Sequence, residues 1–109
     1  MDKKVLTEKL SEFIRIKEEL VETEEISADV GVLKIRDTLL RVGNLLKENL
    51  EEDYYIGTIT AGIGNKNTAY IIIKKNKKNL DVCCYAREGL IKQHTARKAI
   101  NKFETELLQ

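Results

Sequence analysis

The stretch YIIIKKNKKNLDVCCY, residues 70–85, decides which fold the sequence predicts. Its two ends are apolar and rich in β-branched and aromatic residues, which favour strands. Between them, KKNKKN holds four lysines, two asparagines and no acid. Asparagine tolerates the left-handed backbone of a tight turn, and lysines keep an exposed turn soluble. The stretch therefore predicts a β-hairpin with a basic tip, and it raises the question of whether that tip also binds phosphate.

The residues before this hairpin predict one more strand, because apolar and polar side chains alternate through YYIGTITAGIG at residues 54–64. Together these segments predict a three-stranded antiparallel sheet. The core face of the last strand is expected to carry Leu80, Val82 and Cys84. The alternate positions of the sheet carry a second apolar set, which comprises Ile56, Tyr70, Ile72, Cys83 and Tyr85.

Apolar residues at intervals of three and four predict three helices around this sheet. The first is expected from about Asp2 to Glu25, and the second from Ser27, a good N-cap, to Leu50. The third is expected from about Gly89 to Leu108, with a buried stripe of Ala96, Ala99, Ile100, Phe103 and Leu107. The predicted fold class is therefore α+β, with two N-terminal helices, a three-stranded antiparallel sheet and a C-terminal helix in the order α-α-β-β-β-α.

The composition fits one small folded domain over residues 1–109, with an amphipathic helix at 1–26 and an α-β-β-β-α core at 27–109. No apolar run approaches the roughly 18 residues of a membrane span, and MDKKVLTEKLSEF lacks the apolar region of a secretory signal. Cys83 and Cys84 are adjacent, and neighbours in a strand point to opposite faces, so a bridge between them would be strained. We expect reduced thiols in a cytoplasmic protein that has no membrane partner.

The sequence gives no support for an enzyme, and we predict no catalytic residues, no metal and no cofactor. His94 is the only histidine, and no carboxylate stands where a triad would need one. Together with Cys83 and Cys84 it lacks the spacing of zinc ligands. The segment GIGNKNT at 62–68 lacks the contiguous G-K-[ST] of a phosphate-binding loop and joins two strands. A reactive thiol near Arg87 is the alternative to small buried residues in a strand, which is the interpretation we favour.

Charge divides the chain into two halves. Residues 1–53 hold 9 basic and 14 acidic residues, a net of −5, and residues 54–109 hold 10 and 4, a net of +6. The predicted last helix has its basic residues first and its acids last, which opposes the helix macrodipole but suits a bound phosphate. Alternatively, Glu88 or the acids of the first two helices neutralise these basic residues, within one fold or across a dimer.

This asymmetry favours a non-enzymatic protein that binds RNA or DNA through the phosphate backbone. The expected contacts lie on the hairpin tip and the last helix, and they are Lys74, Lys75, Lys77, Lys78, Lys92, Arg97, Lys98 and Lys102. Such binding depends steeply on salt and discriminates poorly between sequences.

The layout of residues 28–108 resembles that of double-stranded-RNA-binding domains: a helix, three antiparallel strands, and a helix with a basic N-terminus. HTARKAINKF, residues 94–103, looks like the last helix of those domains. The resemblance implies recognition of A-form RNA by shape, across grooves and phosphates. The loop GIGNKN at 62–67 lacks the histidine expected from that family, and many small α+β domains share this order, so we assign no family.

A second class of function is a homo-oligomeric interaction module, such as an adaptor, a chaperone or an inhibitor of another protein. Its interface would be the second apolar face of the sheet (Ile56, Tyr70, Ile72, Tyr85) together with the first helix. Alternatively, the first helix covers this face, or its tyrosines stack on bases. The two classes differ in geometry, because nucleic-acid binding requires the tip lysines and the basic helix residues to share one face.

Overall fold

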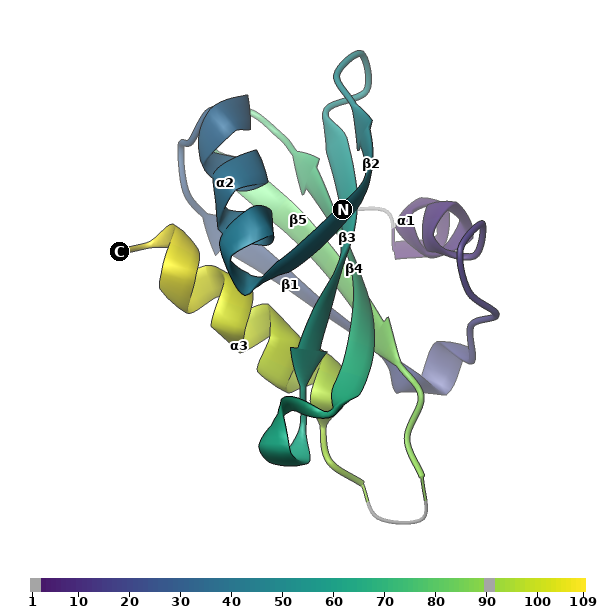
Figure 1. Cartoon of the computed structure of the whole chain (residues 1–109). Helices are drawn as coiled ribbons and strands as arrows, with labels where there is room; N and C mark the ends of the chain where they lie inside the picture. The colour runs from purple at the N-terminus through teal and green to yellow at the C-terminus, as the bar shows by residue number, and fades with distance from the viewer. Residues whose placement is uncertain (1–2, 90–91) are drawn as a thin grey trace.

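The computed structural model describes residues 3–89 and 92–109, whose backbone forms a five-stranded antiparallel sheet (Figure 1). The strands are β1 (Val21–Ser27), β2 (Gly43–Asn49), β3 (Tyr54–Ala61), β4 (Asn67–Lys75) and β5 (Asn79–Ala86). They lie side by side in the order β1-β5-β4-β3-β2. The α+β class is confirmed, but the prediction of a three-stranded sheet in the order α-α-β-β-β-α is wrong.

The described helices lie on both faces of the sheet. On one face pack α2 (Val32–Val42) and α3 (Thr95–Leu107), and across the other lies α1 (Lys3–Leu10) (Figure 1). Short 3-10 turns occur at Glu18–Leu20 (η1) and Ile63–Asn65 (η2). None of the helices in the described part of the chain is long and apolar enough to cross a membrane.

β1 departs furthest from the prediction, which extends the first helix to Glu25. The helix ends at Leu10 instead, and β1 pairs with β5 along its whole length. Glutamate by itself favours helices, but the pairing with β5 and the burial of Val21 and Ile26 override that weak preference. The remaining acidic side chains give the sheet a charged edge, which discourages pairing with another chain.

β2 takes the place of the second half of the predicted second helix. α2 ends at Val42, and the chain enters β2 directly at Gly43. A Cβ atom on Gly43 would lie 1.8 Å from the carbonyl oxygen of Thr58, so only glycine allows β2 to approach β3 this closely. Leu46 and Leu50, which lie in the second half of the predicted helix, are exposed on this strand and the turn after it.

α3 begins at Thr95 rather than at Gly89, and Leu90 and Ile91 lie outside the described residues. Its predicted buried stripe is confirmed from Ala96 to Leu107. The predicted resemblance to the layout of double-stranded-RNA-binding domains is wrong. The strand β1 precedes α2, and a further strand, β2, follows α2 immediately.

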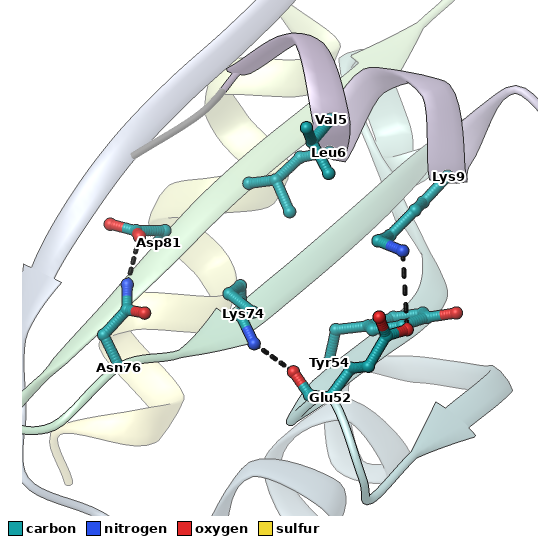
Figure 2. A pocket seen from close by; sticks show the side chains of 8 residues that line it. All are labelled: Val5, Leu6, Lys9, Glu52, Tyr54, Lys74, Asn76 and Asp81. Atoms are coloured by element: carbon teal, nitrogen blue, oxygen red, sulfur yellow. Dashed lines mark hydrogen bonds and ion pairs between the residues drawn. The ribbon is translucent and has the colours of Figure 1, made fainter.

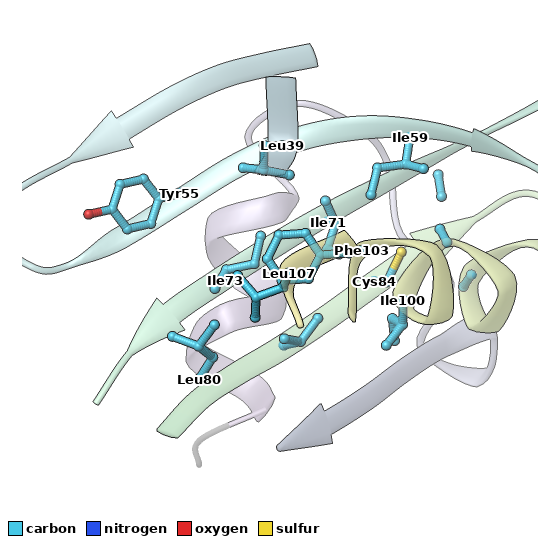
Figure 3. Close-up of a cluster of buried hydrophobic side chains, with 14 of the residues drawn as sticks. Leu39, Tyr55, Ile59, Ile71, Ile73, Leu80, Cys84, Ile100, Phe103 and Leu107 are labelled. Carbon is cyan, nitrogen blue, oxygen red and sulfur yellow. The ribbon is translucent and has the colours of Figure 1, made fainter. Parts of the chain in front are cut away.

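Two hydrophobic cores fill the two faces of the sheet, which confirms the predicted alternation along β5. The larger core lies beneath α2 and α3 and contains Leu80, Cys84 and Phe103 (Figure 3). The smaller core lies beneath α1, where Leu6 and Leu10 pack against the other face of the sheet. Full burial of one such side chain stabilises the folded state by about 1.5–3 kcal/mol. The contacts of α1 with the sheet therefore rest on few buried side chains, chiefly Leu6 and Leu10.

Candidate functional site

The start of α3, where the sequence predicts a bound phosphate, already holds a carboxylate. Glu88 accepts hydrogen bonds from the backbone N–H of Thr95 at 2.8 Å and of Gln93 at 3.1 Å. Burial acts to raise the pKa of Glu88, but these N–H groups outweigh it, and the pKa lies below its usual value. Glu88 therefore provides the negative charge that a helix start favours.

The basic residues predicted on the last helix do not form one free surface, because two of them bind partners within the protein. Arg97 lies 3.2 Å from a carboxylate oxygen of Glu22 and 2.9 Å from one of Glu24, so β1 neutralises it. Lys102 donates a hydrogen bond of 3.0 Å to the carbonyl oxygen of Thr60. Lys92 precedes the helix, and both it and Lys98 are exposed.

The predicted tip lysines lie at the opposite end of β5 from the start of α3. The turn follows β4 and is closed by a hydrogen bond of 2.9 Å from the N–H of Asn76 to the carbonyl oxygen of Asn79. Lys77 and Lys78 are exposed in it, Lys75 is half-buried, and Lys74 donates to the carbonyl oxygen of Glu52. β5 has 8 residues and spans about 26 Å, so the tip and the helix residues form two surfaces.

The predicted interface residues lie inside a single copy of the chain. Ile56, Ile72 and Tyr85 are at most 1% exposed, and Tyr70 is half-buried beside them. α1 and the segment that follows it cover this face, through Leu6 and Leu10.

A pocket of about 340 Å³ lies near the hairpin tip, beneath α1 (Figure 2). We call it the tip pocket, and it is lined by Val5, Leu6, Lys9, Glu52, Tyr54, Lys74, Asn76 and Asp81. The ammonium group of Lys9 lies 3.6 Å from the Glu52 carboxylate and 4.6 Å from the centre of the Tyr54 ring. Because Lys74 is also bonded to Glu52, both basic groups of the tip pocket already have partners within the protein.

A second pocket, of about 330 Å³, lies at the other end of the sheet. We call it the arginine pocket, and it is lined by Arg15, Ile16, Lys17, Leu20, Tyr85, Arg87 and Glu88. The sequence contains five arginines, and Arg36, Arg41 and Arg97 are paired with glutamates. Within residues 3–89 and 92–109, Arg15 and Arg87 form no ion pair, and both line this one pocket.

The arginine pocket is not predicted from the sequence, in which Arg87 is considered only as a neighbour of a reactive thiol. Arg15 and Lys17 both fall within the first helix that the sequence predicts, which extends to about Glu25. In the structure the chain has left α1 by this point and runs back along the sheet to β1. The alternation of RIK, with Ile16 half-buried and both neighbours exposed, is the one local signal of an extended segment.

The two cysteines are buried free thiols. Burial raises the pKa of both Cys83 and Cys84. Both are therefore protonated at neutral pH and are poor nucleophiles.

Searches of protein-family models, of curated proteins and of solved structures found nothing that matches this chain. The fold alone does not indicate a function, because many functions share one fold.

Proposed function

We propose that this protein is a non-enzymatic nucleic-acid-binding protein that holds phosphate in the arginine pocket. One observation carries the proposal: the two arginines without an ion pair among the described residues line the same pocket. Arginine presents a planar fork of N–H donors that matches phosphate oxygens in pairs. An anion bound there would gain two such forks without first breaking a salt bridge.

The charge balance of the arginine pocket supports this proposal. The pocket is lined by three basic residues and one acid: Arg15, Lys17 and Arg87, and Glu88. The two carboxylate oxygens of Glu88 already accept hydrogen bonds from backbone N–H groups. The lysines of the hairpin tip, about 26 Å away along β5, offer a second and weaker contact for a long strand. In this proposal the arginine pocket replaces the basic residues of α3 as the main phosphate site.

Self-association, the other class of function, stays a prediction. The face expected to mediate it is covered by α1 within one copy, so a dimer would need another surface. Sedimentation equilibrium of the full chain would measure it directly.

The test is a titration of fluorescently labelled single-stranded RNA, duplex RNA and duplex DNA, at roughly 50 and 200 mM salt. We expect binding that weakens steeply with salt. The variant Arg15→Ala/Arg87→Ala should bind roughly 30-fold more weakly, because it loses two charge-assisted contacts. The tip variant Lys75→Ala/Lys77→Ala/Lys78→Ala should bind roughly threefold more weakly, since Lys77 and Lys78 are exposed to solvent.

The matched control is Lys34→Ala/Arg41→Ala, which removes the same charge from α2, outside both pockets. It should bind within about twofold of the unaltered protein if local contacts decide affinity rather than net charge. Absence of binding at roughly 50 mM salt would overturn the proposal. An equal loss in the control and in the arginine variant would also overturn it.

A further inference from the structure

The two sides of the arginine pocket differ in charge. Toward η2, a hollow that shares Arg87 and Glu88 with the pocket is also lined by Lys66, which is exposed. Toward β1, a hollow that shares Leu20 and Glu88 with it is also lined by Glu19 and Glu22. A polyanion that leaves the pocket toward η2 meets a lysine, whereas one that leaves toward β1 meets carboxylates.

The basic residues on the side toward β1 do not cancel this difference. That hollow contains Lys92 and Arg97 against the three glutamates that line it. Arg97 is already held by Glu22 and Glu24. A strand that continued in this direction would have to displace those glutamates or lie against them, and like charges at close range are costly.

We propose that the arginine pocket receives the terminal phosphate of a nucleic-acid strand, and that the strand leaves past Lys66. This inference rests on the proposed function and specifies its ligand. A terminal phosphate monoester carries roughly −1.5 to −2 charges at pH 7 and has three acceptor oxygens, whereas a backbone diester carries roughly one charge. Two guanidinium forks and the ammonium group of Lys17 provide enough donors for three oxygens.

Tyr85 adds an uncharged polar group to the pocket. Its side chain lines the pocket and is only 1% exposed. The hydroxyls of buried tyrosines usually find a hydrogen-bond partner. In the complex, the Tyr85 hydroxyl would donate to a phosphate oxygen, which adds a neutral donor to the charged groups of the pocket.

The experiment compares three single-stranded RNAs of one sequence at roughly 100 mM salt. One carries a 5′-phosphate, one a 3′-phosphate, and one has hydroxyls at both ends, with the fluorophore inside the strand. We expect one phosphorylated end to bind about tenfold more tightly than the hydroxyl strand. Arg15→Ala/Arg87→Ala should abolish this difference and Tyr85→Phe should reduce it, while Lys34→Ala/Arg41→Ala should leave it intact.

Two outcomes would overturn this inference but spare the proposed function. One is equal affinity for all three strands, with binding still lost in Arg15→Ala/Arg87→Ala. The other is a free nucleoside monophosphate that binds as tightly as the phosphorylated strand, since the strand past Lys66 would then contribute nothing. Absence of binding to every strand, also at roughly 50 mM salt, would overturn both.

Discussion

The tip pocket and the arginine pocket have almost the same volume, about 340 and 330 Å³. They differ in whether their basic side chains already have partners. Each contains at least two basic side chains. In the tip pocket these are held by Glu52 and the Tyr54 ring, whereas in the arginine pocket no described residue pairs with them. The number of basic residues in a pocket is therefore a poor guide to anion binding. Their availability matters more, because a paired lysine must first lose its partner.

Reversal of one charge in each pocket should produce the largest difference between the two. Arg87→Glu should weaken RNA binding roughly 100-fold at low salt, because it removes a phosphate contact and puts a carboxylate beside Glu88. Lys9→Glu in the tip pocket should change affinity less than about threefold. Fluorescence anisotropy measures both, with circular dichroism to verify folding. Similar losses in the two variants would show that net charge, and not the pocket, governs binding.

Glu88 allows stability and binding to be separated. Glu88→Ala should cost about 1–2 kcal/mol of unfolding free energy, because the backbone N–H groups of Thr95, at the start of α3, and of Gln93, just before it, lose their acceptor. The same variant should bind phosphate more tightly, since the one acid of the arginine pocket is gone. Urea unfolding and RNA titration measure the two effects. A variant that lost both stability and affinity would contradict this account of Glu88.

The pH dependence of Glu88 follows from its lowered pKa. The unfolded chain has the ordinary value of 4.5, so the stabilisation is complete above that pH. It disappears as pH falls through the lower pKa of the folded state, because the unfolded state binds the proton more readily. Urea unfolding of Glu88→Ala should therefore lose part of the acid destabilisation that the unaltered protein shows below about pH 4.5.

A smaller effect is expected when the tip pocket is made more like the arginine pocket. Glu52→Gln removes the carboxylate that neutralises Lys9 and should raise RNA affinity roughly threefold at low salt. Stability should change by less than about 1 kcal/mol, because Glu52 is exposed. Glu51→Gln, at the neighbouring exposed position, is the matched control for the loss of one negative charge. Equal gains in the two variants would indicate a nonlocal charge effect.

The sequence predicts the parts of the fold where a local pattern and the tertiary structure agree. β3 to β5 and the buried stripe of α3 have such patterns. β1 does not, because VETEEIS reads as helical until β5 is placed beside it. Gly43 is the one local sign that the second helix ends early, and its role depends on a carbonyl of β3. For the site, Arg87 is recognisable as basic, but its position beside Arg15 requires the path of residues 11–20 across the sheet.

The pairing of β1 with β5 has a consequence for how the chain folds. β1 emerges early during synthesis, but its only partner in the sheet is the last strand to be made. α1 likewise packs on β4 and β5. β1 therefore has no strand partner until β5, which ends at Ala86, is free to fold, and closing so long a loop slows folding. Until β5 has been made, Val21 and Ile26 stay exposed, and the three glutamates between them keep the unpaired β1 segment soluble.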